Sequence, residues 1–455
     1  MSQRKVGRLI GSVAIMILAL FAFAGTSGAI EIKRMVLSNG AVLLVSEQHQ
    51  LPMVTIAMAF DGGSRRDPKG KEGLAHLTAE SLAEGTKDLT AEQLNEKIDF
   101  MGSSIAVAAG QDYASAGMTS LKKYSADTLH LLATVLTAPA LRDDDILRKR
   151  AEQLAELSSA EEQPSYIAER DFTKLLFGVD SPYGHLPTGG TDTVSKLTPN
   201  DVRNFYHQYY RLGGAIISVA GDVKTDEVKA DLEKELQGLQ GAVQPQATPP
   251  APKVAPGEHL TKIDRDVAQA TLVLGFGGIE RSNPDYYKLQ VMNYILGGGG
   301  FSSRLVKTVR SEHGLAYSVS SGFEAALFPG SFRVVLQTKN RSANEAVKLV
   351  IENLHRIQQQ PVSDAELESA KKFLIGSFPL KYDRLSSIAS FMLQVELYHL
   401  GLDYADRYPK IIAAVTKEDV QKGAREYLHP DSFILVAVAN QSEAAITVAS
   451  DTPHQ

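Results

Sequence analysis

A lone histidine, His76, lies in a segment with part of the spacing of a zinc site. The segment GLAHLTAESLAEGT, residues 73–86, has the outline of a helix that begins after a glycine. In an H-x-x-E-H motif, histidines at i and i+4 reach one metal ion from one helix face, and the glutamate at i+3 takes a proton from the bound water. Ala79 and Glu80 occupy the positions of that glutamate and of the second histidine. The segment therefore keeps one ligand and lacks the base.

The rest of the sequence offers no second histidine for the same helix face. Of the 11 histidines, the two nearest to each other are His185 and His207, which are too far apart to share a turn of helix. Other catalytic classes find no support, because the sequence has no cysteine and no G-x-S-x-G elbow. The glycine-rich stretch GGGGFSSR, residues 297–304, lacks the lysine of a phosphate-binding loop.

Several stretches occur twice and indicate an internal repeat. TPNDVRNFYHQYY, which begins at Thr198, matches TKEDVQKGAREYL, which begins at Thr416, and an apolar strand follows each. Both threonines are expected helix N-caps, with an aspartate three residues later in the capping-box position. Near the front of each half an alternating strand ends in two glycines, VTIAMAFDGG and ATLVLGFGG. These matches predict two copies of one domain.

A linker separates the two copies. Segment 242–257 is rich in proline and alanine and has almost no large apolar side chains, which predicts an extended spacer. We expect an N-terminal domain at 30–241, a C-terminal domain at 258–445 and a tail at 446–455. Amphipathic runs such as NEAVKLVIENLHRI and strands such as GSFRVVLQTK predict an α+β fold. In each domain we expect a mainly antiparallel sheet with helices packed on one face.

The composition is that of an ordinary globular protein. The chain has 455 residues, of which 44% are hydrophobic and 22% charged, so two domains with full cores can form. The net charge of -6 gives no electrostatic reason to expect nucleic acid as a partner.

The first 29 residues predict a secretory signal peptide. Basic residues at positions 4, 5 and 8 precede an apolar run at 9–24, and small residues follow, with cleavage expected after Ala24 or Ala29. An export signal in a chain without cysteine suits a bacterial periplasm, with no stable membrane insertion after cleavage. The alternative is an uncleaved anchor in the inner membrane, because no charged residue occurs from Leu9 through Ile30.

The segment DGGSRRDPKGKEGLAHLTAESLAEGTKDLT resembles the metal-binding region of the pitrilysin/insulinase family, the inverzincin zinc peptidases. The similarity continues through SPYGHLPTGGTDTVSKLTPNDVRNFYHQYY and GGGGFSSRLVKTVRSEHGLAYSVSSGF, and it covers essentially the whole mature chain. It is closest to the short, two-domain, processing-peptidase-like members. The resemblance implies that the strand SSIAVAAG, residues 103–110, corresponds to the family's edge strand, which pairs with substrate.

On this resemblance His76 is the first ligand position, Ala79 replaces the catalytic base and Glu80 replaces the second histidine. Glu156 falls where the family has its third ligand. A set of His76, Glu80 and Glu156 could coordinate a metal, but without a base it could not activate water. The alternative, which we favour, is that His76 and Glu80 form a hydrogen-bonded i, i+4 pair and Glu156 is a charged helix residue. We therefore expect no metal and no other cofactor in this chain.

By the same resemblance, the C-terminal half retains residues that bind substrate in the family. The resemblance implies that Arg304 in FSSRL and Tyr317 in GLAYSV grip the substrate backbone and the oxyanion of the tetrahedral intermediate. An arginine stays charged, and a phenol can donate a hydrogen bond to a developing oxyanion. Glycine lets a peptide backbone approach closely, so the neighbouring substrate-binding candidates are Gly298, Gly299, Gly300 and Phe301.

The resemblance implies the non-catalytic, substrate-binding subunit of a heterodimeric zinc metalloendopeptidase. A homologous chain with an intact H-x-x-E-H motif would hold the zinc, and this chain would complete that site through Arg304 and Tyr317. The chain would be inactive alone, would act on peptides or unfolded proteins, and could form a homodimer when isolated. Two alternatives stay open: a scaffold or peptide-binding protein without a proteolytic role, and a self-sufficient hydrolase with a variant metal site.

Overall fold

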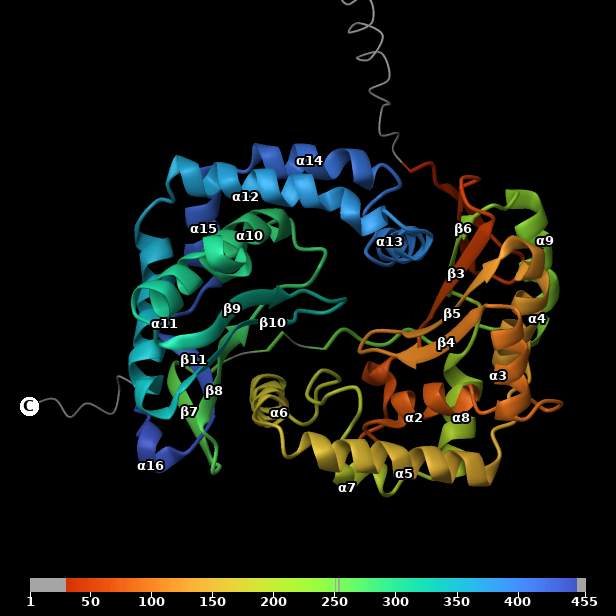
Figure 1. Ribbon diagram of the computed structural model, residues 1–455, viewed down its shortest axis with the longest axis horizontal. Helices are drawn as coiled ribbons and strands as arrows, with labels where there is room; N and C mark the ends of the chain where they lie inside the picture. Colours follow the sequence, from red (N-terminus) through yellow and green to blue (C-terminus); the bar gives the residue numbers. More distant parts are fainter. Residues whose placement is uncertain (1–29, 250, 253, 448–455) are drawn as a thin grey trace, which may run out of the picture.

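The computed structural model describes residues 30–249, 251–252 and 254–447 (Figure 1). The predicted signal peptide and positions 448–455 of the predicted tail lie outside these residues. Within the described part of the chain, no helix is long and apolar enough to cross a membrane.

The first half contains a six-stranded sheet with strand order β1-β2-β6-β3-β5-β4. β2 and β6 are parallel, and the other neighbouring pairs are antiparallel. The strands are β1 (Lys33–Val36), β2 (Val42–Glu47), β3 (Met53–Phe60), β4 (Ser104–Ala109), β5 (Ala114–Leu121) and β6 (Ile216–Gly221). The helices are α2 (Leu74–Leu82), α3 (Ala91–Phe100), α4 (Ser125–Thr137), α5 (Asp143–Ala160), α6 (Pro164–Phe177), α7 (Thr191–Val194), α8 (Pro199–Tyr209) and α9 (Thr225–Glu235), with short 3-10 turns η1 (Ser64–Arg66), η2 (Lys122–Tyr124) and η3 (Gln237–Leu239).

The second half contains a five-stranded sheet with strand order β7-β11-β8-β10-β9, in which only β7 and β11 are parallel. The strands are β7 (Gly257–Asp264), β8 (Gln269–Gly277), β9 (Ala316–Glu324), β10 (Ser331–Lys339) and β11 (Ser432–Ala439). The α-helices are α10 (Tyr286–Asn293), α11 (Ala343–Gln359), α12 (Asp364–Ser377), α13 (Leu385–Leu397), α14 (Tyr404–Ala414), α15 (Lys417–Tyr427) and α16 (Gln441–Ala444). Two π-helical segments, η4 (Tyr294–Gly298) and η6 (Val306–Glu312), and the 3-10 turns η5 (Gly300–Ser302), η7 (Asn340–Ser342) and η8 (Phe378–Tyr382) complete this half.

The two sheets have the same topology. The order β2-β6-β3-β5-β4 matches β7-β11-β8-β10-β9, and β1 is an addition to the first sheet. The helices follow in the same sequence, so that α2 corresponds to α10, α5 to α12, α6 to α13 and α8 to α15. The predicted α+β fold with two homologous halves is confirmed.

Local sequence explains why the repeated helices begin where they do. The Thr198 hydroxyl accepts the Asp201 N–H at 3.3 Å, and the Asp201 carboxylate accepts the Thr198 N–H at 2.9 Å. Thr416 and Asp419 form the same pair, with distances of 3.1 and 3.0 Å. Each capping box satisfies two backbone N–H groups that have no partner inside the helix.

Each sheet receives a helix from the other half. One face of each sheet packs on helices of its own half in a large apolar core. On the other face, α13 of the second half packs on β3 and β6, and α6 of the first half packs on β8 and β11. Figure 1 shows α13 and α6 between the two halves. The sequence predicted helices on one face only; the second layer is supplied crosswise.

Close packing and a hydrogen bond fix this exchange. The buried ring of Phe172 on α6 lies against Gly275 of β8, where an added Cβ would come within 2.7 Å of the ring. On the other side, the Ser218 hydroxyl of β6 donates to the Ala389 carbonyl of α13 at 2.8 Å.

A third contact joins the halves at the turn between β9 and β10. The carboxylate of Asp112, which is 6% exposed, accepts the Leu327 N–H at 3.0 Å and also the Tyr183 hydroxyl proton. The Tyr183 hydroxyl in turn accepts the Phe328 N–H at 3.3 Å. The turn that follows β9 is therefore held against the first half.

Substitution Phe172→Ala is expected to lower the free energy of unfolding by about 3–5 kcal/mol, because it removes a fully buried ring and leaves a cavity between the halves. Urea unfolding followed by far-UV circular dichroism measures the change. The matched control is Leu175→Ala on the same helix, whose side chain is 48% exposed. It should change the value by less than about 0.5 kcal/mol. Equal losses for the two variants would contradict the crosswise packing.

Candidate functional site

The helix that carries His76 starts at a fixed point. Its N-cap residue, Gly73, has a left-handed φ of 97°, and an added Cβ would lie 2.7 Å from the Thr188 carbonyl oxygen. The Asp67 carboxylate accepts the N–H groups of Gly73 at 2.8 Å and Ala75 at 2.7 Å. Burial raises the pKa of Asp67 to about 8, although these two hydrogen bonds oppose the shift. Burial thus favours the protonated form of the group that anchors the start of α2.

The predicted pair of His76 and Glu80 does not form. Both side chains are partly exposed on one side of α2, but within the described residues His76 makes no hydrogen bond. The Glu80 Oε2 atom instead lies 3.6 Å from Nζ of Lys149 on α5. The pairing with Glu80 was therefore predicted wrongly: a lysine from a second helix competes for this carboxylate.

Lys149 is the centre of a cluster of carboxylates. Its Nζ lies 3.1 Å from both Glu84 and Glu152, in addition to Glu80. Burial alone lowers the pKa of Lys149, but its hydrogen bonds with Glu152 and Glu84 outweigh burial and leave the pKa raised. Lys149 is therefore a positively charged side chain held among three carboxylates.

The arrangement does not fit a zinc ion. Ala79 is fully buried and provides no base, and Glu156 is an exposed residue of α5, as predicted for a charged helix residue. Among the residues that the structure describes, no group of three or more His, Cys, Asp or Glu side chains is placed to hold a metal. Lys149 also competes with a metal ion for the carboxylate of Glu80, the residue at the second ligand position. With alanine at position 79, α2 has no side chain there that could take a proton from a metal-bound water.

Arg304 is held by an ion pair within its own half. Its Nε and Nη2 atoms donate to the two carboxylate oxygens of Glu366 on α12, at 2.7 and 3.0 Å. Glu366 also closes the capping box of α12 by accepting the Ser363 N–H at 2.8 Å. Burial alone would raise the pKa of Glu366, but hydrogen bonds from Arg304 and Ser363 lower it to about 2. The guanidinium is thus fixed in one orientation by a carboxylate that stays ionised.

One end of this guanidinium has no partner. Nη1 of Arg304 is buried and, within the described part of the protein, makes no hydrogen bond. A buried donor without a partner costs roughly 1–3 kcal/mol. Arg304 therefore retains donor capacity beyond the Glu366 pair.

Tyr317 and the glycine-rich loop are exposed. Tyr317 is the second residue of β9, and its side chain is 49% exposed. In the loop, Gly300 has a left-handed φ of 56°, and Phe301 is 76% exposed. The Arg310 guanidinium lies 5.0 Å from the centre of the Phe301 ring. These side chains are accessible to a ligand, unlike Ala79.

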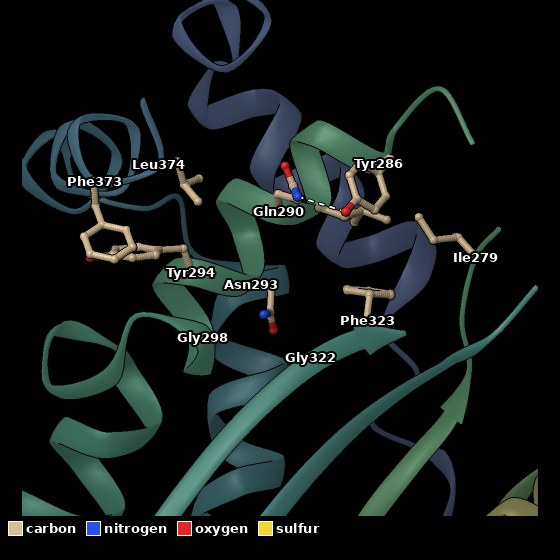
Figure 2. A pocket seen from close by; sticks show the side chains of 11 residues that line it. Ile279, Tyr286, Gln290, Asn293, Tyr294, Gly298, Gly322, Phe323, Phe373 and Leu374 are labelled. Atoms are coloured by element: carbon tan, nitrogen blue, oxygen red, sulfur yellow. Dashed lines mark hydrogen bonds between the residues drawn. The ribbon is translucent and has the colours of Figure 1, made fainter. Parts of the chain in front are cut away.

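A hollow adjoins the loop. It has a volume of about 260 Å³ and lies between α10, η4, β9 and α12, with Gly298 in its lining (Figure 2). The predicted edge strand SSIAVAAG corresponds to β4, which lies at the edge of the first sheet beside α2. β9 has the equivalent edge position in the second sheet, beside α10.

Two family models match successive parts of the chain. The model described as insulinase (peptidase family M16) matches residues 42–179, and the model described as peptidase M16 inactive domain matches residues 196–374. The chain belongs to the insulinase (M16) peptidase family. The resemblance inferred from the sequence is confirmed, and the chain is a member with a degenerate zinc motif.

Relatives of similar length support this assignment. The chain is 28% identical over 406 residues to a protein named non-peptidase homolog YmxG from Helicobacter pylori, covering 88% of this chain and 92% of that protein. It is 26% identical over 407 residues to an uncharacterized zinc protease, YmxG, from Bacillus subtilis, covering 88% and 96%. The crystal structure of a peptidase M16 inactive domain from Pseudomonas fluorescens matches with a TM-score of 0.84 at 26% identity, covering 92% and 98%.

Sequence reasoning missed Lys149 and Glu366 in this M16 protein. Lys149 lies two helical turns before Glu156, so it shares the helix face on which the family places a ligand. That spacing could have indicated a cation at the degenerate site. Glu366 carries only a local signal, the capping box with Ser363, and nothing near it in sequence indicates Arg304, which is 62 residues away.

Restoring the H-x-x-E-H motif by Ala79→Glu and Glu80→His is expected to give only weak zinc binding, because the Lys149 cation remains beside the site. Adding Lys149→Gln should tighten binding about tenfold or more. Competition with a chromogenic chelator on the purified chain measures both affinities, and Lys149→Gln alone should bind no zinc. Equal affinities for the double and triple variants would show that Lys149 does not oppose a metal.

Replacing Glu366 by Gln is expected to reduce stability more at neutral pH than in acid. The folded-state pKa of about 2 lies below the ordinary value of 4.5, so the ionised group stabilises the fold above about pH 4.5, and this contribution is lost as the pH falls toward 2. The difference from wild type should be about 1–3 kcal/mol at pH 7 and smaller at pH 3.5, by urea unfolding. Glu368→Gln, on the exposed side of α12, is the control and should change little at either pH. A pH-independent difference would rule out the ionised pair.

Proposed function

We propose that this chain is the non-catalytic, substrate-binding subunit of an exported, heterodimeric zinc metalloendopeptidase. A homologous chain with an intact H-x-x-E-H motif provides the zinc and the base. This chain covers that site, and Arg304 and Tyr317 bind the substrate backbone and the oxyanion that forms during peptide hydrolysis. The substrate is a peptide or an unfolded protein.

The observation that carries the proposal is the contrast between the two halves. At α2 the base is replaced by a buried alanine, and Lys149 forms ion pairs with the neighbouring carboxylates. In the second half, Tyr317 is half exposed, and Arg304 is oriented by Glu366 with Nη1 still unpaired among the described residues. A fixed arginine loses little side-chain entropy when it binds an oxygen, which favours transition-state stabilisation. A scaffold would have no need for an oriented arginine with an unpaired donor or for an exposed tyrosine in the same half.

The sequence of the N-terminal segment supports the proposed export. Basic residues at positions 4, 5 and 8, the apolar run at 9–24 and small residues up to Ala29 support a cleaved signal and a periplasmic location. An uncleaved inner-membrane anchor would keep the protein in the same compartment. The zinc partner must then be exported too.

The experiment is to purify the tagged chain from its native host and to assay it with a quenched-fluorescent peptide library. We expect peptide cleavage that a chelator stops, together with a homologous zinc-containing chain in the eluate. Tyr317→Phe should lower kcat by roughly 10²–10³, because it removes one donor to the oxyanion. Arg304→Ala should have an effect of similar size.

The control is Arg407→Ala on α14, where the arginine is ion-paired with Asp403 at 2.9 Å and has no proposed contact with substrate. This variant should cleave peptides at the wild-type rate. A preparation with no chelator-sensitive cleavage and no such companion chain would refute the proposal and leave a binding or scaffold protein. Chelator-sensitive cleavage by the chain alone would instead support the self-sufficient hydrolase.

A further inference from the structure

The hollow in the second half lies where the first half has its degenerate zinc helix. α10 follows β8 as α2 follows β3, and β9 holds the edge position that β4 holds in the first sheet. α10 lies beside β9 as α2 lies beside β4. The repeat thus places a recess at its second site position, while the first carries the ion pairs around Lys149.

The hollow is lined by apolar side chains together with polar side chains, among which Asn293 and Gln290 are already hydrogen-bonded. Figure 2 shows Ile279, Phe323, Phe373 and Leu374 around the space, with Gln290 and Asn293 on α10. The Asn293 amide donates to the Ser321 carbonyl at 3.0 Å and accepts the Ser321 hydroxyl proton at 2.7 Å. The Gln290 amide donates to the Tyr286 hydroxyl at 2.9 Å.

None of the 11 lining residues, all of which lie in the described part of the chain, carries a charge. An acidic or basic group placed in the hollow would lose its water without gaining an ionic partner. The lining therefore disfavours a charged occupant, and its apolar side chains can contact an aromatic or aliphatic one.

An aromatic ring, that of Phe373, and an unobstructed residue of β9, Gly322, lie at the mouth of the hollow. Phe373 on α12 is 54% exposed, and its ring centre lies 4.9 Å from that of Tyr294. Ser302 of the glycine-rich loop donates to the Tyr294 hydroxyl at 3.3 Å, which connects the mouth to the loop beside Arg304. At Gly322 of β9, an added Cβ would meet no atom within 4 Å, so the space over this residue is free.

The free space suits one side chain rather than a strand or a small molecule. Its volume of about 260 Å³ is below the roughly 300–1,000 Å³ of small-molecule pockets. At Ser321 the edge of β9 is covered, because Asn293 occupies the carbonyl and a Cβ on Gly297 would lie 2.8 Å from the Ser321 nitrogen. A peptide cannot pair with β9 at that point, but it can place a side chain into the recess next to it.

We propose that this hollow binds a single aromatic or large aliphatic side chain of the peptide substrate. The proposal deepens the function proposed above, because it names the residue class that the subunit selects. Phe373 and Tyr294 provide aromatic faces, for which an aromatic ring gains a favourable edge or offset contact beyond simple burial. The glycine-rich loop and Arg304 then lie beside the bound peptide backbone.

The test uses the purified full chain without a partner and fluorescein-labelled ten-residue peptides of Ala, Ser and Thr with one central Phe, Ala or Asp. Fluorescence anisotropy should give a Kd for the Phe peptide roughly tenfold or more below that of the Ala peptide, and the weakest binding for the Asp peptide. Gly322→Leu, which fills the recess from an open position, should abolish the preference for Phe. Phe373→Ala should weaken it several-fold.

Phe100→Ala is the matched control, since Phe100 is an exposed phenylalanine at the end of α3 in the other half. It should leave the preference unchanged. Equal binding of the three peptides, or a preference that survives Gly322→Leu with an unchanged circular dichroism spectrum, would overturn the inference.

The outcomes also separate this inference from the proposed function. If the preference for Phe is absent while the native preparation cleaves peptides in an Arg304-dependent way, only this inference fails. If the Phe peptide is preferred and no zinc-containing companion chain is found, the inference about the hollow is supported. The proposed role as a peptidase subunit is then refuted.

Discussion

The crosswise exchange of α6 and α13 is the constraint on which the rest of the structure depends. Each sheet has two faces, and the helices of its own half cover only one of them. The second face of each carries apolar side chains that water would otherwise contact, and the helix from the other half buries them. Neither half can complete its layers alone. The two site positions, at α2 and at α10, are therefore held in a fixed relation, whereas halves joined by a small polar interface would be expected to move.

The sequence predicted what is determined locally and what is repeated. Thr198 and Thr416 cap their helices as expected, because a capping box involves residues only three apart. The repeat predicted two equivalent sheets, since the same apolar strands and glycine pairs occur in both halves. The position of α6 could not be predicted. The spacing of Ile167, Ala168 and Phe172 shows that the helix has an apolar face, but not that this face meets β8 and β11 of the other half.

The same division applies to the candidate site. Residue types at positions 76, 79 and 80 were sufficient to show that the metal motif is degenerate, because ligand spacing on a helix is a local property. Lys149 and Glu366 were missed because each acts through a contact between different helices. The Arg304–Glu366 pair depends on how α12 packs against the turn before η6, and the expected His76–Glu80 pair is prevented by a side chain from α5. The hollow likewise depends on four separate elements and has no sequence signature.

The two halves differ in how the charged groups at their site positions are paired. At α2, the Lys149 ammonium lies within 3.6 Å of Glu80 and 3.1 Å of Glu84 and Glu152, and Arg148 also pairs with Glu84 and Glu152. Each of these carboxylates therefore already has a cationic partner from α5. In the second half, Nη1 of Arg304 is a buried donor without a partner among the described residues, and an open recess without charged groups lies beside the glycine-rich loop. A buried donor without a partner costs free energy, which packing alone would be expected to remove. The unpaired Arg304 donor and the open recess are the two observations that favour the substrate-binding role proposed for the second half.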